Sequence, residues 1–255
     1  MSFPNIVYGK PGQEKTSHST GVYSLGQKMV FEDGREFVYA HCSSTAALSI
    51  GELTVQKAVS STGHVVSLTG SAAIGATTIA VTLSATGAVT KDQFKDGWIG
   101  NFASGTAGWL YKIKSHASGA VSSTVNFILY PYDPVIRTLA AATSKVMIRE
   151  NEFKGTLVRA AATSQPGINV GVPANTVAAD YYYWAQRVGP AMVLVAGTVG
   201  LVGEPATAAT TVAGGFQRFL TGADTTTVPA NWSLGRWLVA PAASTDYGMV
   251  YLDIR

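Results

Sequence analysis

The segment spanning residues 180–204, DYYYWAQRVGPAMVLVAGTVGLVGE, constrains the fold of this chain more than any other. Residues 181–186 contain three tyrosines and a tryptophan, a composition typical of a half-buried β-strand. Residues 187–190 hold the glycine and proline of a turn, and residues 191–196 form an apolar run too short for a buried helix. We therefore predict a β-hairpin here, continued into a meander by the glycine-spaced residues 197–203, at the centre of an all-β domain.

Similar strand patterns recur along the chain, with turn residues about every ten positions. The dipeptide Asp33-Gly34 is typical of a hairpin turn and separates two strand-like segments, residues 28–31 and 36–40. Residues 134–142 are the one stretch with helical character, because a proline occupies its first position. We expect an all-β fold, a β-sandwich or barrel-like domain or domains, with an extended N-terminal arm and little helix.

Composition divides the chain into three parts. Residues 1–20 are polar and show no periodicity, so we expect an N-terminal arm, either a disordered tail or a segment that orders against a neighbouring subunit. Residues 60–145 are rich in Ser, Thr and Gly and predict a β subdomain. We expect this subdomain to be inserted in a main β domain made of residues 21–59 and 146–255.

The charge content limits the classes of partner. Only 13% of the residues are charged, against a usual value of about 25%. This favours a surface largely covered by neighbouring subunits, although a β domain covered with Ser, Thr and Ala is the alternative. The net charge of +3 is small and the Lys and Arg residues are scattered, whereas a nucleic-acid-binding protein usually shows a basic stripe. We therefore expect no nucleic-acid partner.

The sequence also shows no membrane or secretion signal. It has no apolar run of roughly 18 residues, and its first residues lack the pattern of a signal peptide, so we expect no membrane partner. Cys42 is the single cysteine, which excludes an intrachain disulfide and fits folding in a reducing cytoplasm. We predict that Cys42 is a small buried residue.

No catalytic signature is present in the sequence. The four histidines, His18, His41, His64 and His116, lie far apart, and none has a neighbour at metal-ligand spacing. The glycine-rich segments lack the Lys-Ser/Thr ending of a phosphate loop, and no G-x-S-x-G elbow occurs. We expect a protein that is not an enzyme, with no catalytic residues, no metal site and no cofactor.

The aromatic residues are the best candidates for contact with other subunits. Strand alternation sends two of the residues 181–184 to each face of a sheet, so one pair is exposed unless something covers it. The candidate contact residues are Phe3, Ile6, Tyr8, Tyr182, Trp184 and Trp237. A sugar-binding platform that uses Trp98, Trp109 or Trp232 is an alternative role for aromatic side chains.

Two blocks of sequence resemble structural proteins of tailed bacteriophages. In the C-terminal block the resemblance lies in YYYWAQRVGPAMVLVAGTVGLVGEP, which has an aromatic strand ending in W-x-Q, and in the later segments SLGRWLVAPA and MVYLDI. In the N-terminal block, SLGQKMVFEDGREFVYAHCSS and GELTV are similar to the opening of phage capsid-associated proteins. The blocks together make up about half of the chain and leave the Ser/Thr-rich middle unassigned.

This resemblance implies a virion structural protein, most like a capsid decoration (cement) protein. Such a protein is made in the cytoplasm of the host bacterium, binds the outer surface of the capsid as a homotrimer, contacts the major capsid protein and stabilises the shell. The chain is longer than small decoration proteins, which the inserted subdomain would explain. A tail, baseplate or fibre component and, from another class, a carbohydrate-binding β module are the alternatives.

Overall fold

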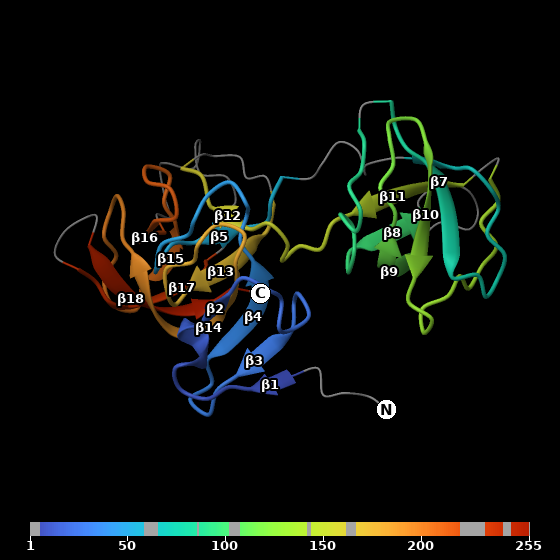
Figure 1. Ribbon diagram of the computed structural model, residues 1–255. Helices are drawn as coiled ribbons and strands as arrows, with labels where there is room; N and C mark the ends of the chain where they lie inside the picture. The colour runs from blue at the N-terminus through green and yellow to red at the C-terminus, as the bar shows by residue number, and fades with distance from the viewer. Residues whose placement is uncertain are drawn as a thin grey trace. The chain divides into compact units, whose positions relative to one another are not determined.

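The fold is known from a computed structural model that describes residues 6–58, 66–85, 87–101, 108–141, 144–161, 167–219, 233–241 and 246–254. These residues are almost entirely strand and loop, which confirms the predicted all-β class with little helix; their helical element is one 3-10 turn, η1 (Gln13–Lys15). The chain divides into two compact units, unit 1 (residues 1–57 and 152–255) and unit 2 (residues 58–151) (Figure 1).

Unit 1 contains a twelve-stranded mixed sheet. The main path of the sheet runs, in spatial order, through β1 (Ile6–Tyr8), β3 (Lys28–Val30), β4 (Glu36–His41), β14 (Tyr182–Leu194), β18 (Tyr247–Asp253), β17 (Gly235–Val239), β15 (Pro205–Ala208) and β16 (Phe216–Arg218). Off this path lie β2 (Ser17–His18), β5 (Thr54–Val55), β12 (Leu157–Val158) and β13 (Asn169–Pro173). The pairing of β1 with β3 is parallel, and the strands on both sides of β14 pair with it in antiparallel fashion.

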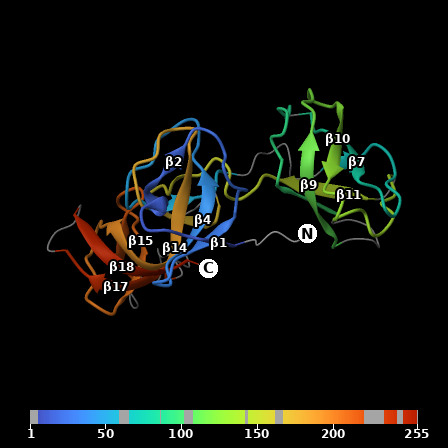
Figure 2. The ribbon, with the colours of Figure 1, turned by 60° about the horizontal axis from the view of Figure 1, so that its bottom comes forward.

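Strand β14 is the centre of this sheet and corrects the predicted hairpin. It runs as one strand of 13 residues through the segment that was expected to turn back on itself. Its first half pairs with β4 and its second half with β18, and Val188 is the residue that pairs with both strands (Figure 2). The register with β4 shifts between Gln186 and Val188, so Arg187 is the extra residue of a β-bulge.

The glycine and proline that suggested a turn serve the bulge instead. Gly189 has a φ of 93°, a left-handed conformation that glycine adopts without strain. Pro190 comes after the last residue that pairs with β4, so its missing N–H does not interrupt that ladder. The side chain of Gln186 donates from Nε2 to the carbonyl oxygens of Val188 (3.2 Å) and Pro190 (2.9 Å) and thereby ties the residues on both sides of Gly189 to the start of the bulge.

The core of unit 1 lies on both sides of β14 in its first half and on one side in its second half. Tyr183 and Ala185 belong to a cluster on one face, and Trp184 belongs to a second cluster on the opposite face. Further along the strand, Ala191 and Val193 enter a third cluster. Successive side chains alternate between the two faces, as they do in any strand. In the first half of β14 a buried cluster covers each face, whereas in the second half only one face has a buried cluster.

The segment expected to be an arm contributes two short strands to the sheet. Residues 6–8 form β1, and residues 17–18 form β2, which pairs with β14 opposite Tyr182 and Tyr183. The described residues of the segment are thus neither a tail nor a free arm. The predicted turn at Asp33-Gly34 is confirmed, since it joins β3 and β4 in antiparallel pairing.

Unit 2 is a closed six-stranded barrel. Around the barrel the strands follow the order β10 (Thr124–Leu129), β7 (Thr78–Thr82), β6 (Val66–Leu68), β11 (Lys145–Arg149), β8 (Trp98–Asn101) and β9 (Leu110–His116). The alternate side chains that point inward are apolar and buried, among them Ile79, Ile99, Ile113 and Phe127. Because β11 belongs to the barrel, the expected boundary at residue 145 lay too early in the chain.

The helix expected at residues 134–142 does not form in the described part of that stretch. Val135 and Leu139 are both fully buried in the barrel core, and the backbone of Leu139 bridges to Ala72 in antiparallel fashion. The segment is extended because each of these two residues exchanges backbone hydrogen bonds with the chain near Ala72 and Ala76 rather than with its own preceding turn.

We predict that Gly189→Ala lowers the free energy of unfolding of unit 1 by about 2 kcal/mol. A Cβ at this position would be forced into the left-handed region and would lie 2.8 Å from Cγ of Arg35. Urea unfolding followed by tryptophan fluorescence measures the effect. The matched control is Gly12→Ala, which lies in the same unit and has a similar φ of 95°, but whose added Cβ meets nothing within 4 Å; a midpoint as low for this control as for Gly189→Ala would contradict the role of the contact with Arg35.

Candidate subunit interface

The second half of β14, together with β18 and β17, carries apolar side chains on both faces of the sheet. The inward side chains, including Val193, Val250, Leu252 and Trp237, are all fully buried in one cluster. Strands that are apolar on both faces are typical of strands that are buried on both faces. The outward side chains of these three strands are therefore the first place to look for a contact with another molecule.

The outward side chains form a continuous apolar surface across the three strands. Met192 lies opposite Met249, which in turn lies opposite Val239, and Leu194 lies opposite Tyr247. Met192, Tyr247 and Val239 are 47%, 44% and 54% exposed. We call this surface the outer face; its members are Pro190, Met192, Leu194, Leu238, Val239, Tyr247, Met249 and Tyr251.

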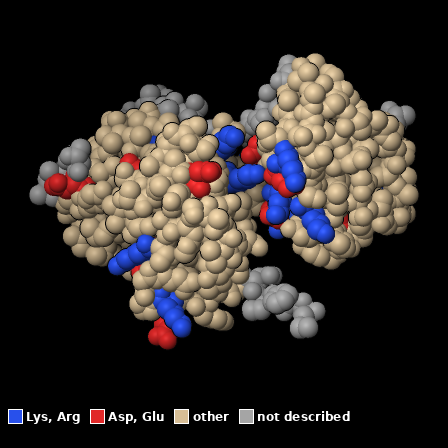
Figure 3. Space-filling view, viewed as in Figure 1, with Lys and Arg blue, Asp and Glu red and all other residues tan. Residues whose placement is uncertain are grey.

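Little charge interrupts the outer face. The charged side chains at outward positions of these strands are Arg236 and Asp253, and the guanidinium of Arg236 donates from Nη1 to the carbonyl oxygen of Gly203 (3.0 Å). The turn that contains Gly203 exposes Leu201 and Val202 beside β17. In a space-filling view, wide areas of the visible surface of unit 1 carry no charge (Figure 3). A contiguous exposed apolar patch of this kind is rare on proteins that work alone and marks interaction surfaces.

A second open feature of unit 1 is the edge strand β1. It is the last strand on the path of the sheet, so its outer edge has no strand partner among the described residues. Ile6 and Tyr8 share one face of β1 and are 41% and 81% exposed. An unpaired edge presents backbone N–H and C=O groups that a strand of another chain can pair with.

The structure separates the six residues that the sequence suggested as contacts. Ile6 and Tyr8 are exposed on β1, and Phe3 lies outside the described residues. Trp184 and Trp237 are corrections: both indole rings are completely buried inside unit 1 and have no surface to offer a partner. Tyr182 is half-buried, with its ring stacked 5.8 Å from that of Tyr39.

The aromatic pair that was expected to need another molecule is covered by the chain itself. The ring of Tyr23 packs 5.1 Å from that of Trp184, and the ring of Tyr39 packs 4.9 Å from it. Residues from the N-terminal part of the chain therefore close the face of β14 that Trp184 occupies. The sequence did not reveal this because both partners lie more than a hundred positions away.

Sequence reasoning missed the residues that the outer face brings together. Met192, Met249, Tyr247 and Tyr251 were not proposed as contacts. A signal was nevertheless present: the runs AMVLV and YGMVYL are apolar at both odd and even positions, whereas a strand with one wet face alternates apolar and polar residues.

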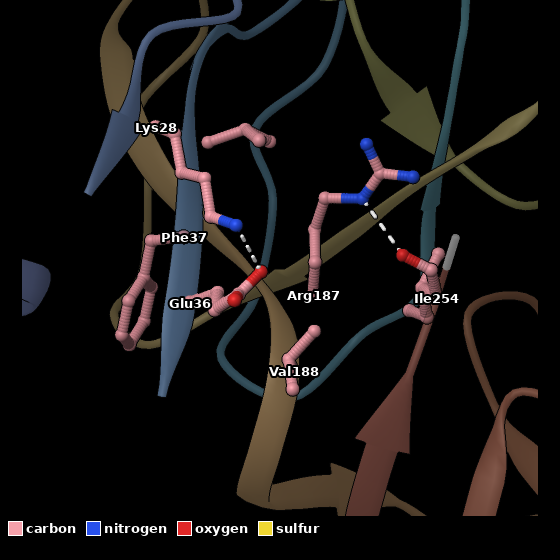
Figure 4. Close-up of a pocket in the computed structure, with 7 residues that line it drawn as sticks. Lys28, Glu36, Phe37, Arg187, Val188 and Ile254 are labelled. Atoms are coloured by element: carbon pink, nitrogen blue, oxygen red, sulfur yellow. Dashed lines mark hydrogen bonds and ion pairs between the residues drawn. The ribbon is translucent and has the colours of Figure 1, made fainter. Parts of the chain in front are cut away.

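Near the bulge of β14, unit 1 has a surface hollow of about 400 Å³ (Figure 4). It is lined by Lys28, Glu36, Phe37, Val38, Arg187, Val188 and Ile254. The bulge directs the side chain of Arg187 here, where Nε donates to the carbonyl oxygen of Ile254 (2.9 Å). Burial lowers the pKa of Arg187, while the nearby carboxylates of Glu152 and Glu36 oppose that shift.

The residues that line this hollow carry two positive charges, on Lys28 and Arg187, and one negative charge, on Glu36. Lys28 Nζ forms a 2.7 Å ion pair with Glu36, and Figure 4 shows the guanidinium of Arg187 directed away from that pair. Such an arrangement has room for a side chain of a partner protein. It contains no pair of carboxylates held across a cleft and no nucleophile beside a base.

Two of the four histidines, His18 and His41, lie on either side of the same residue of β14. Both His18 and His41 lie opposite Tyr182, because β2 and β4 each pair with that residue. His41 Nε2 lies 3.2 Å from a carboxylate oxygen of Asp180, and burial lowers the pKa of His41. Among the residues that the structure describes, no group of three or more His, Cys, Asp or Glu side chains could hold a metal ion.

The comparisons with known proteins identify no relative of this chain. No protein-family model, no curated protein and no solved structure matches the chain. Within the described residues there is also no helix with the length and apolar character needed to span a bilayer. The physical features of the two units are therefore what any functional assignment must rest on.

We predict that Cys42 is unreactive in the folded protein. Its side chain is fully buried, its Sγ lies 3.1 Å from the carbonyl oxygen of Ala46, and burial raises the pKa of the thiol to about 11. About one thiol in a thousand would then be ionised at pH 8. Reaction with Ellman's reagent at pH 8 should be slow without urea and fast in urea. Equal rates in the two conditions would show that Cys42 is accessible.

Proposed function

We propose that this chain is a non-enzymatic structural protein of a tailed-phage virion, most like a capsid decoration protein. In this proposal it binds the outer surface of the capsid as a homotrimer, contacts the major capsid protein and stabilises the shell. The observation that carries the proposal is the outer face, on which Met192, Tyr247, Met249 and Tyr251 form an apolar surface on strands already buried on their other side. The low charge content and the sequence resemblance agree with it.

The occupant that we assign to the outer face is a second copy of the chain. A face with few charged groups, Arg236 and Asp253, makes no strong electrostatic demand on its partner, so different parts of the outer face can pack against one another around a three-fold axis. Burying Met and Tyr side chains removes apolar area from water at about 25 cal/mol per Å². Self-association would thus cover the outward apolar side chains of β14 and β18, whose strands are apolar on both faces.

Attachment to a shell would then depend on several weak contacts acting together. A trimer offers each contact three times, so the second and third contacts form at high effective concentration once the first is made. A protein that binds the assembled shell and not its separated subunits stabilises the shell by mass action. The exposed edge strand β1, with Ile6 and Tyr8, is the part of unit 1 that we assign to the capsid subunit.

Two other functions compete with this proposal. A tail, baseplate or fibre component would use the same outer face for self-association in another part of the virion. A carbohydrate-binding module would use tryptophans, and one observation favours keeping it: the half-buried Trp98 and the 39% exposed Trp109 belong to the same short β8–β9 ladder, one at each end of it.

The test of self-association is the substitution of Met192 by Asp. A carboxylate in the middle of the outer face would have to lose its water in any contact there, which costs several kcal/mol. We expect light scattering to report a trimer for the wild-type protein and a monomer for Met192→Asp at about 10 μM.

The matched control is Val22→Asp, since Val22 is 57% exposed in unit 1 and is not part of the outer face. It should behave as the wild type does. A monomeric wild-type protein, or a variant with unchanged mass, would remove the outer face from the proposal. Antibody labelling of phage particles then separates the capsid from the tail as the location.

A further inference from the structure

The net positive charge of the chain comes from unit 2. Residues 58–151 contain seven Lys or Arg and four Asp or Glu, whereas the remainder of the chain has eleven of each. Unit 1 is therefore neutral, and unit 2 carries the whole net charge of +3. A separation of charge between two units suggests that they meet different partners.

The cations of unit 2 are concentrated on one side of the barrel. The outward positions of β11, β8 and β9 alternate with the buried ones, and the three strands are neighbours in the order β11-β8-β9. We call this surface the basic face; its members are Trp98, Gly100, Leu110, Lys112, Lys114, Lys145, Met147 and Arg149. In Figure 3, the charged side chains of unit 2 lie together and leave a wide uncharged area beside them.

The outward positions on the opposite side of the barrel have a different chemistry. Strands β7 and β10 present Thr78, Thr82, Thr124 and Asn126. The hydroxyl of Thr69 lies 2.8 Å from that of Thr82 and 3.3 Å from that of Thr124, so these side chains bond to one another. The barrel therefore has one hydroxyl-rich side and one basic side.

The acidic groups of unit 2 are engaged within the barrel. Asp92 accepts from the backbone N–H of His116, and Asp133 accepts from the backbone N–H of Lys112. Asp96 accepts from the hydroxyl of Tyr130, and Glu150 accepts from the side-chain amide of Gln93. Each carboxylate thus fixes a turn or a strand end.

Lysines of the basic face, in contrast, form no ion pair. Lys112, Lys114 and Lys145 have no carboxylate within 4.0 Å among the described residues. Lys114 and Lys145 are exposed, and Lys112 Nζ lies 5.6 Å from the ring centre of Trp98. These ammonium groups are held on a rigid barrel and are available to an anionic ligand.

Apolar surface accompanies the cations on the same face. Leu110 and Met147 are 57% and 47% exposed, and both lie opposite Gly100 on the central strand β8. The side chain of Leu110 leans over Gly100, since a Cβ built on Gly100 would lie 3.3 Å from Cδ1 of Leu110. Leu110 and Met147 thus form a small apolar surface beside Lys112 and Lys145, and a sugar ring can pack on this surface.

We propose that the basic face of unit 2 binds a polysaccharide that carries anionic groups. Sugar rings present C–H surfaces that can pack on exposed apolar side chains such as Leu110 and Met147, while their acidic substituents reach the lysines. Lys112 and Lys114 lie about 7 Å apart along β9, and β9 and β11 lie about 10 Å apart across β8. These spacings suit a polymer with charges on some of its residues.

The same observations favour a polysaccharide over a nucleic acid. A nucleic acid carries a charge on every residue, and its single-stranded forms bind through a strongly basic groove with several exposed aromatic platforms. Unit 2 has a net charge of +3, and Lys112 already covers one face of Trp98. This inference does not depend on the proposed role in a virion, since it uses unit 2 alone.

The test is a binding measurement on the full-length protein with four immobilised polymers. Alginate carries carboxylates, dextran sulfate carries sulfate esters, unmodified dextran carries no charge, and a poly(dT) oligonucleotide carries phosphates. We expect binding to alginate, dextran sulfate or both at low salt, weakened about tenfold or more at 0.3 M NaCl, where screening is strong. The two anionic polysaccharides together show which acidic group is preferred.

The variant that tests the face is the double substitution Lys112→Ala and Lys145→Ala. We expect it to weaken binding about tenfold, because it removes two solvent-exposed charge contacts. The matched control is Lys10→Ala with Lys15→Ala, which removes two exposed lysines from unit 1 and should bind as the wild type does. A thermal melt followed by circular dichroism verifies that each variant is folded.

Four results would overturn the inference. They are no binding to either anionic polysaccharide, equal binding to unmodified dextran, tighter binding to poly(dT), and unchanged affinity in the folded Lys112→Ala/Lys145→Ala variant. The light-scattering experiment on Met192→Asp concerns unit 1, so the two proposals can fail separately.

Discussion

The sheet of unit 1 depends on strand β14, which stays hydrogen-bonded to neighbouring strands before and after its β-bulge. β14 pairs with β4 before the bulge and with β18 after it, and these are the two halves of the sheet. Arg187, the extra residue, ties the bulge to the end of β18, because Nε donates to the carbonyl oxygen of Ile254 and the N–H of Ile254 donates to the carbonyl oxygen of Arg187. Val188, which pairs with both Glu36 and Asp253, is the residue at which the two halves meet.

The two halves of β14 meet different surroundings, and this difference explains the distribution of apolar surface. In the first half, the N-terminal part of the chain packs Tyr23 and Tyr39 over Trp184, so both faces are buried within one molecule. In the second half, the chain covers the inner face and leaves Met192 exposed. The same alternating pattern of side chains thus produces a closed core in one place and an open surface in the other.

The sequence predicts the kind of structure better than its connections. Alternating apolar residues with frequent turns were enough to give the all-β class, and the Asp33-Gly34 turn was found because its backbone requirement is local. The bulge in β14 was mistaken for a turn, because Gly189 and Pro190 satisfy the local requirements of both. The burial of Trp184 could not be found, since it depends on long-range partners.

The candidate surfaces show the same limit. Lys112 and Lys145 are far apart in the chain, so their positive charges looked scattered until the order β11-β8-β9 placed them on one side of a barrel. Met192 and Met249 likewise meet through strand pairing. In each case the residue types can be read from the sequence, but strand pairing decides which of them lie next to one another.

Strand β5, which ends at Val55, and β12, which begins at Leu157, pair with each other in antiparallel fashion, and Leu157 lies opposite Val55. The chain therefore leaves unit 1 for the barrel and re-enters it at neighbouring points of the same small ladder. A gene encoding unit 1 could gain, lose or exchange the entire barrel between these two points, with only a short turn needed to close the gap. The architecture is thus suited to recombination, in which an unchanged unit 1 could accept a different inserted domain.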